Sequence, residues 1–367
     1  MKKRWITYIL MFALICNISM SATGLIIENK STFSDFGDDY DFIVDDDGTA
    51  DFNKIQDAIN SAFSGDTIFV KNGFYKENLV VEKSIILIGE NKIDTIVDGG
   101  IKTTFLKKES TVIQVNANNV KISGFTFKNA TGIDGRGIYI LKERGKGYTS
   151  NNNISDNIIR DCSYGMIIVN PVRNIIINNS FYNCTGGFYI TTLPYYENTY
   201  EKNTVNGKPL LYIIGKENLT IDDNVGCIAL LDCKNITIQN LTTSNITVGI
   251  DISFSDNITV TNCTITGTNR GGIYVHYSNN CKFIKNTFID DNWGIFLRKS
   301  NNNQMLNNNF VNITKHDWFS SAYINKWDGN YWEKPLSHPK LIYGKIGGFR
   351  GMIPWFNIDW NPSEESN

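Results

Sequence analysis

Residues 257–278 read NITVTNCTITGTNRGGIYVHYS, and close copies of this stretch lie on both sides of it. The preceding copy is NITIQNLTTSNITVGIDISFS at residues 235–255, and the following copy is NCKFIKNTFIDDNWGIFLRKS at residues 280–300. Each copy begins with Asn, alternates apolar and polar residues, turns, and resumes the alternation after a glycine. Earlier copies begin at Asn119, Asn153 and Asn174. The chain is therefore a repeat with a period of about 22 residues.

The alternation within each copy is typical of β-strands and not of helices. One copy cannot close a core alone, but stacked copies form parallel sheets with a rise of about 4.8 Å per coil. The period also suits a leucine-rich repeat, yet its leucine frame and helical segment are absent, and a propeller blade needs about 40 residues. The sequence predicts an all-β, single-stranded parallel β-helix from about residue 40 to 315. Parallel crossovers favour the right-handed form.

The recurrent Asn at the corners has a physical use in such a stack. Asn tolerates left-handed backbone and can hydrogen-bond to backbone groups of adjacent coils. The copy between Leu193 and Cys233 is irregular, which predicts an interruption of the stack there.

The ends of a solenoid must be covered, because open strand edges template aggregation. Residues 53–63 have apolar residues at helical spacing, and Asn53 with Gln56 resembles a capping box, so we predict an N-terminal capping helix. Residues 316–367 lose the repeat and hold five of the seven tryptophans. We interpret them as an irregular, Trp-rich C-terminal cap; a separate binding module is the alternative.

Residues 1–22 combine a basic start, a short apolar run and small residues, as in a signal peptide. An uncleaved N-terminal anchor is the alternative. No second apolar span follows, so we expect a mature chain without a transmembrane anchor, located outside the cytoplasm. The net charge of −2 and the pI near 6.0 argue against a nucleic-acid partner.

Six cysteines follow the apolar start, namely Cys162, Cys184, Cys227, Cys233, Cys263 and Cys281. An even number in an exported chain permits disulfides, whereas buried free thiols are the alternative. Cys162 and Cys184 each lie three residues before a repeat glycine, so we expect them on neighbouring coils, close enough for a bond.

Side chains that follow the repeat glycines predict a site. The residues one and three positions after each glycine are apolar and should point inward, so the residues between them point outward. Two outward rows result: Tyr139, Ile167, Tyr189, Asp251, Tyr274 and Phe296, and then Leu141, Val169, Thr191, Ser253, His276 and Arg298. The candidate substrate-binding residues are Tyr139, Tyr189, Asp251, Tyr274, His276, Phe296 and Arg298.

Aromatic faces stack on sugar rings, and an acid, an imidazole and a guanidinium on adjacent coils could bind a uronate or act as acid and base. A face that only packs under a covering loop is the alternative. We expect no cofactor, and no metal site, because soft copper ligands at a defined spacing are missing.

Residues 47–91, from DGTADFNKIQDAINSAF to IILIGEN, resemble the entry segment of pectin-lyase-like β-helix proteins, pectin methylesterases included. The Asn-rich repeats resemble the NosD-like, carbohydrate-binding and sugar-hydrolase group of these proteins. The catalytic strings of pectin methylesterases and polygalacturonases do not occur here, which leaves any enzymatic activity open. The resemblance implies an exported β-helix that binds carbohydrate or a cell-envelope polymer. A diverged polysaccharide lyase, hydrolase or epimerase is one alternative, and a NosD-like accessory to metal or cofactor maturation is another.

Overall fold

The computed structural model describes residues 40–48, 50–100, 111–131, 135–141, 147–184, 188–190, 197–222, 225–246, 248–268, 270–315, 317–348 and 351–367. The predicted signal peptide lies outside the described residues. Across the part of the chain that is described, no helix has the length and hydrophobicity needed to cross a lipid bilayer. The side chain of Tyr189 also lies outside the described set.

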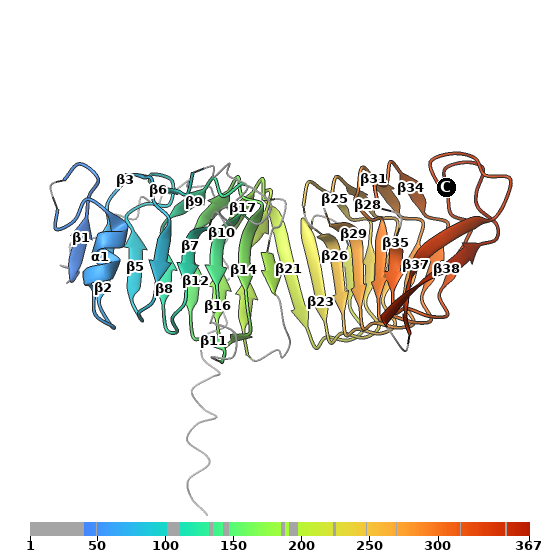
Figure 1. The fold of residues 1–367 in the computed structure, drawn as a ribbon, viewed down its shortest axis with the longest axis horizontal. Coiled ribbons are helices and arrows are strands. Elements are labelled where there is room, and N and C mark those ends of the chain that lie inside the picture. Colours follow the sequence, from blue (N-terminus) through green and yellow to red (C-terminus); the bar gives the residue numbers. More distant parts are fainter. Residues whose placement is uncertain are drawn as a thin grey trace, which may run out of the picture. The chain divides into compact units, whose positions relative to one another are not determined.

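The described residues form an all-β parallel coil, as predicted, with three short strands in each regular turn (Figure 1). Strands of successive turns pair side by side and build three sheets in an N-terminal stack, from Tyr40 to Val205. Sheet 1 contains β1 (Phe42–Val44), β2 (Thr67–Val70), β5 (Ile86–Gly89), β8 (Lys121–Ser123), β12 (Asn153–Ser155), β16 (Ile175–Ile177) and β19 (Thr199–Glu201). Sheet 2 contains β3 (Gly73–Tyr75), β6 (Thr95–Asp98), β9 (Thr126–Lys128), β13 (Ile158–Arg160), β17 (Ser180–Tyr182) and β20 (Thr204–Val205). Sheet 3 contains β4 (Leu79–Val81), β7 (Thr111–Val115), β10 (Arg136–Ile140), β14 (Tyr164–Ile168) and β18 (Phe188–Ile190), while β11 (Thr149–Ser150) pairs with β15 (Pro171–Val172).

A C-terminal stack repeats this arrangement from Lys208 onward. One sheet contains β21 (Lys208–Ile214), β23 (Cys227–Leu231), β26 (Val248–Ser253), β29 (Gly271–His276), β32 (Ile295–Arg298), β35 (Asp317–Ser320) and β37 (Lys340–Gly348). A second contains β22 (Thr220–Asp222), β24 (Thr237–Gln239), β27 (Thr259–Thr261), β30 (Lys282–Ile284), β33 (Gln304–Leu306), β36 (Lys326–Asp328) and β38 (Gly351–Asp359). The third contains β25 (Thr242–Ser244), β28 (Thr264–Thr266), β31 (Thr287–Ile289) and β34 (Asn309–Val311).

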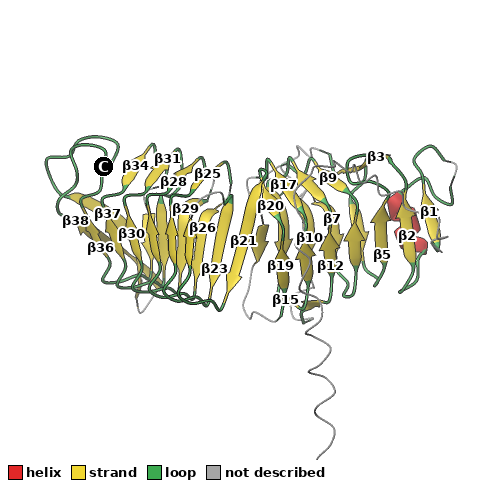
Figure 2. Cartoon of the chain, turned by 180° about the vertical axis from the view of Figure 1, so that it is seen from behind, coloured by secondary structure: helices red, strands yellow, loops and turns green. Residues whose placement is uncertain are grey.

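The predicted irregularity between Leu193 and Cys233 is confirmed as a break between the two stacks (Figure 2). There β20 and β21 form an antiparallel hairpin, with Val205 opposite Lys208, around a turn in which Asn206 and Gly207 both have positive φ. The buried apolar residues divide into two clusters at about the same place. Between residues 237 and 311, every strand pairing among the described residues is parallel, as the repeat predicts.

Two roles were predicted for the corner asparagines: left-handed backbone and hydrogen bonds to adjacent coils. Neighbouring residues fill these two roles. Asn178 has a left-handed backbone with φ of 56°, and the next residue, Asn179, is fully buried. The Asn179 amide donates to the Ile154 carbonyl oxygen of the preceding coil at 2.9 Å, and its backbone N–H donates to Oδ1 of Asn203 on the next coil at 3.0 Å. Such ladders satisfy backbone groups that the corners would otherwise leave buried without partners.

The N-terminal helix is present as α1 (Ile55–Ser61), and it buries Ile55, Ala58 and Ile59 against the first coil. The predicted capping box is wrong. The N-cap is Lys54, whose side chain has no acceptor, and the carboxylate of Glu77 instead accepts from the backbone N–H groups of Ile55 and Gln56 at 2.8 and 3.0 Å. The carboxylate of Glu77, about 20 residues further along the chain, therefore caps the helix in place of a side chain at its own N-terminus.

The segment 316–367 contains two further coil strands before it departs from the repeat. β35 and β36 pair in parallel with β32 and β33, and Trp318, Trp327 and Trp332 pack around Phe310 as buried residues. Trp355 and Trp360, by contrast, are exposed.

Candidate functional site

Five of the predicted site residues come together on the outer face of β26, β29 and β32. The residues that should point inward do so: Ile250, Ile252, Ile273, Val275, Ile295 and Leu297 are completely buried. The outward residues between them are in register across the coils, with Asp251 opposite Tyr274 and Tyr274 opposite Phe296. His276 and Arg298 form the next outward pair.

Tyr274 is at the centre of an aromatic stack. Its ring lies parallel to that of Phe296 at 5.4 Å between centroids, and Phe296 in turn contacts Trp293 at 4.9 Å. The guanidinium of Arg270 lies 5.0 Å from the centre of the Tyr274 ring. These neighbours leave Tyr274 only 9% exposed, so this outward-pointing side chain is largely covered. The outward direction of Tyr274 was predicted from the alternation, but its coverage by neighbouring side chains was not.

Positively charged side chains lie along the aromatic stack of Tyr274, Phe296 and Trp293. Besides Arg270, the ammonium of Lys315 lies 5.6 Å from the centre of the Trp293 ring, and Arg298 is exposed at the end of β32. Cations over aromatic faces hold the rings in place and leave positive charge at the surface.

The carboxyl group of Asp251 is partly buried beside these rings. Ser253 donates a hydrogen bond from Oγ to Asp251 Oδ1 at 2.8 Å. Burial raises the pKa of Asp251 to about 6, while the Ser253 hydrogen bond and the charge of Arg270 act in the opposite direction. Near neutral pH a fraction of these carboxyl groups is therefore protonated and able to donate a hydrogen bond.

The imidazole of His276 is held uncharged. Burial lowers the pKa of His276 to about 4, with further lowering by Arg298, Lys299 and Arg270. Its ring contacts Tyr277 at 4.4 Å and Phe254 at 5.8 Å between centroids. At neutral pH this group is a neutral donor and acceptor and not a cation.

A second aromatic column borders the site at the corner after each of these strands. Phe254, Tyr277 and Lys299 occupy that corner on successive coils with φ of 50°, 49° and 50°. Phe254 and Tyr277 stack at 4.8 Å, and the Lys299 ammonium lies 4.7 Å from the centre of the Tyr277 ring and hydrogen-bonds to its hydroxyl group.

An alignment of the repeat copies would have revealed this column, because it shows Phe254 and Tyr277 at a type of corner that most copies fill with Asn or Asp. Asn or Asp occupies most of the left-handed corners outside glycine, because a short polar side chain tolerates that backbone. Bulky Phe and Tyr at such a corner cost conformational energy, and unfavourable backbone of this kind concentrates at functional sites.

The remaining two predicted residues lie in the other stack. Tyr139 is half-buried in β10, with the guanidinium of Arg136 at 4.2 Å from its ring centre. Tyr189 pairs through its backbone with Ile167 on β14. The register that unites Asp251, Tyr274 and Phe296 runs from β21 to β32 and does not include these two tyrosines.

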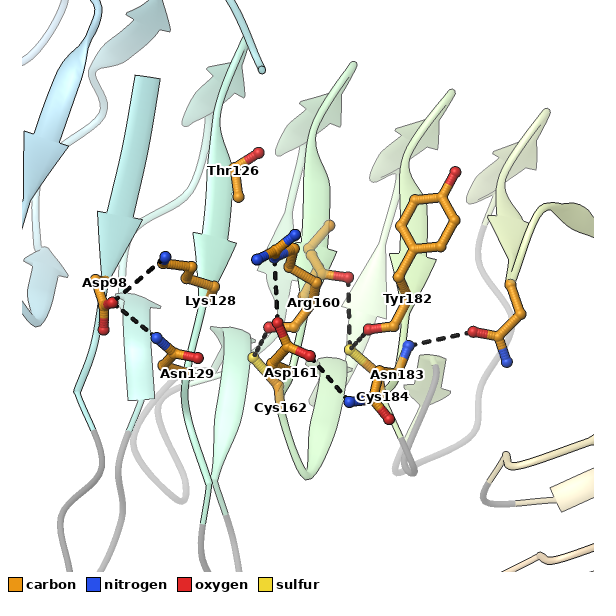
Figure 3. Close-up of polar contacts among 12 residues, drawn as sticks. Asp98, Thr126, Lys128, Asn129, Arg160, Asp161, Cys162, Tyr182, Asn183 and Cys184 are labelled. Atoms are coloured by element: carbon orange, nitrogen blue, oxygen red, sulfur yellow. Dashed lines mark hydrogen bonds and ion pairs between the residues drawn. The ribbon is translucent and has the colours of Figure 1, made fainter. Parts of the chain in front are cut away.

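A polar column on the N-terminal stack also contains charged residues (Figure 3). The Asp98 carboxylate accepts from the Asn129 amide at 2.7 Å and pairs with the Lys128 ammonium at 3.7 Å. Further along, Asp161 pairs with Arg160 at 3.1 Å and accepts from the Asn183 amide at 2.9 Å. Each carboxylate therefore already has partners from its own or the adjacent coil. Within the described residues, no group of three or more His, Cys, Asp or Glu side chains is placed to hold a metal ion.

Comparison with known families adds to this geometry. A family model described as a right handed beta helix region matches residues 101–225 and 216–324. A second, described as pectinesterase, matches residues 41–144. The first match covers more than half of the chain.

Individual proteins are similar over smaller parts or at lower identity. A probable pectinesterase/pectinesterase inhibitor 6 of Arabidopsis thaliana is 35% identical over 106 residues, which is 25% of this chain and 19% of that protein. The chain thus matches about a fifth of the length of this relative. A pectin methylesterase from carrot is 12% identical, with 70% of this chain and 83% of that chain covered and a TM-score of 0.32. An alginate lyase from Paenibacillus sp. str. FPU-7 is 15% identical, with 74% and 91% covered and a TM-score of 0.35. At these TM-scores the two structures say nothing about what this chain acts on.

Proposed function

The chain belongs to the right-handed β-helix family, with a pectin-lyase-like fold, and from that premise we propose that it binds an acidic polysaccharide. The binding face consists of Asp251, Arg270, Tyr274, His276, Trp293, Phe296, Arg298, Lys299 and Lys315, here called the aromatic–basic face. The observation that carries the proposal is the run of stacked rings bordered by four cations.

Each part of this face has a task in binding a sugar chain. The half-buried rings of Phe296 and Trp293 offer rigid apolar area for the faces of pyranose rings. The exposed guanidinium of Arg298 can form a bidentate hydrogen bond to a carboxylate, which favours uronic acids over neutral sugars. The residues repeat at the spacing of the coils, about 4.8 Å, which is close to the length of one sugar residue, so several coils can contact one chain.

Titration with polygalacturonate, and with dextran as an uncharged polymer, tests this proposal by calorimetry. We expect saturable binding of the acidic polymer only, weakened about tenfold or more by Phe296→Ala or Arg298→Ala, because each removes one direct contact. Tyr182→Ala and Arg173→Ala are matched controls on the N-terminal stack, where both side chains are exposed, and should bind like the unaltered protein. Equal binding by Phe296→Ala, Arg298→Ala and the controls would refute the assignment of this face.

A catalytic role is the second candidate, and the raised pKa of Asp251 favours it. A carboxyl group that is partly protonated near pH 6 can act as a general acid or base beside a bound sugar. Incubation of bound polymers followed by mass spectrometry separates the two functions. Cleaved, de-esterified or unsaturated products that vanish in Asp251→Asn would identify an enzyme, and unchanged polymer would identify a binding protein.

Export completes the proposal, because an acidic polysaccharide of a cell envelope lies outside the cytoplasm. The basic and apolar character of residues 1–22 supports it. Expression of the full chain in a secreting host, followed by N-terminal sequencing of the protein in each fraction, tests both export and cleavage.

A further inference from the structure

Strands β37 and β38 form a hairpin at the C-terminal end of the coil (Figure 1). Its exposed apolar side chains are not used by the polysaccharide proposal. The two strands pair antiparallel along their full length, from Lys340 opposite Asp359 to Gly348 opposite Gly351. β37 pairs on its other side with β35 as far as Lys345. β38 pairs with β36 only at Asp359, so the other edge of Gly351–Ile358 has no strand partner among the described residues.

Both faces of this hairpin expose apolar side chains, although Ile342, near its base, is buried in the core. Residues opposite one another in an antiparallel pair point to the same side, which places Tyr343 with Phe356 on one face. That face also carries Leu341 and Met352, and the four side chains are 39–54% exposed. The other face carries Trp355 and Ile353, which are 52% and 50% exposed. Large apolar side chains exposed together on one element mark an interaction site.

The charged residues within the sequence of the hairpin have one sign, whereas Asp317 lies beside Tyr343 on the neighbouring strand β35. Residues 338–358 contain His338, Lys340, Lys345 and Arg350 but no Asp or Glu. Of the described ones, Lys345 is exposed on the same face as Tyr343 and Phe356. The carboxylate at the base, Asp359, is buried and accepts hydrogen bonds from Asn330 and Trp332.

We propose that this hairpin docks into the headgroup region of an anionic lipid bilayer. Because apolar side chains point from both of its faces, the occupant must surround the hairpin, whereas a second copy of the chain laid along one face would leave the other exposed. Lipid surrounds an inserted hairpin, Trp and Tyr are favoured at the boundary between headgroups and acyl chains, and nearby lysines are attracted to anionic headgroups.

Sedimentation of the full chain with vesicles tests the proposal. We expect binding to phosphatidylglycerol vesicles, weakened about tenfold or more in Trp355→Ala/Phe356→Ala, with a smaller loss in Lys345→Glu that is absent on phosphatidylcholine. The control is Phe63→Ala/Ile93→Ala, which removes two exposed apolar side chains of the N-terminal stack and leaves residues 1–39 unchanged. Because every variant keeps the apolar N-terminus, a difference between them reports the hairpin alone.

The outcomes separate the possible occupants. Absence of binding by the unaltered protein, or equal binding by the hairpin variant, overturns the proposal. Concentration-dependent dimerisation in light scattering that the hairpin variant abolishes, without any effect on vesicles, assigns the surface to a second copy and also overturns it. Polygalacturonate binding and the thermal unfolding midpoint of the variant should match those of the unaltered protein, which keeps this test distinct from that of the aromatic–basic face.

Discussion

Asp251 of β26 lies directly in register with Tyr274 of β29, so a carboxyl group is flanked by a phenol ring that carries a guanidinium over its face. The protonation of Asp251 therefore affects the stability of the protein at the same place where binding is proposed. Neighbouring His276 has the opposite response to pH, and the two groups can be separated by substitution.

Asp251→Asn should increase stability above pH 6. Burial raises the pKa of Asp251 from 3.8 to about 6, so the folded state binds this proton more tightly than the unfolded state. The stability of the protein therefore falls as pH rises from about 4 to about 6, by an amount on the order of 2–3 kcal/mol for this group. Urea unfolding at pH 4 and pH 7 measures the effect. The variant should show its advantage only at pH 7, and an equal difference at both pH values would contradict the assignment.

His276→Asn should shift the change in stability between about pH 6.5 and pH 4 toward a gain on acidification. Burial and three nearby cations lower the pKa of His276 from 6.5 to about 4, so the folded state resists the proton that the unfolded state accepts. Stability from this group is complete above about pH 6.5 and is lost as pH falls toward 4. Since Asp251 acts in the opposite direction over much of this range, the unaltered protein changes less than either variant. NMR titration of the His276 ring protons, with an inflection near pH 6.5, would disprove the shift.

Ile273→Ala should destabilise the fold more than Phe296→Ala. Ile273 is completely buried, and its truncation leaves a cavity that costs about 2–5 kcal/mol. Phe296 is half-buried and loses mainly its stacking contacts, at about 1 kcal/mol. Tyr274→Ala should lie between them, because the side chain points outward but is only 9% exposed. Chemical denaturation of the three variants establishes the order.

Glu77→Ala should remove the cap of α1. Its carboxylate accepts the two N–H bonds at the start of the helix, so we expect a loss of about 1–2 kcal/mol. Glu82→Ala removes an exposed acid a few residues away and is the matched control. Similar melting temperatures for the two variants would indicate that the contact contributes nothing.

Cys162 and Cys184 should remain reactive thiols once the protein is unfolded. The predicted placement on adjacent coils is confirmed, and the structure holds both side chains as free thiols (Figure 3). The hydrogen bond with Cys162, together with burial, raises the pKa of the Cys184 thiol, so alkylation of the native protein should be slow. Intact-mass measurement after unfolding without reductant should find all six cysteines from Cys162 to Cys281 alkylated. Two fewer adducts, restored by prior reduction, would instead identify the bond.

The sequence by itself determined the coil, its strand alternation and the sides to which Ile273 and Tyr274 point. These features depend on local periodicity, because a strand reverses its side chains at every residue and a repeat of about 22 residues brings equivalent positions into register. The irregular stretch before Cys233 was also visible as a failure of that period. The site residues on adjacent copies, Asp251, Tyr274 and Phe296, came together for the same reason.

Only the tertiary structure decided how far those side chains are covered and what lies beside them. Arg270, Trp293 and Lys315 reach the aromatic stack from turns between the strands, where periodicity carries no information about direction. Glu77 caps α1 from a separate turn, although Asn53 offered a local signal, because the backbone path of the first coil brings the distant carboxylate closer. The hairpin of β37 and β38 likewise depends on pairing with β35. Which of its apolar side chains are buried, as Ile342 is, and which are exposed, as Trp355 is, depends on what packs over them.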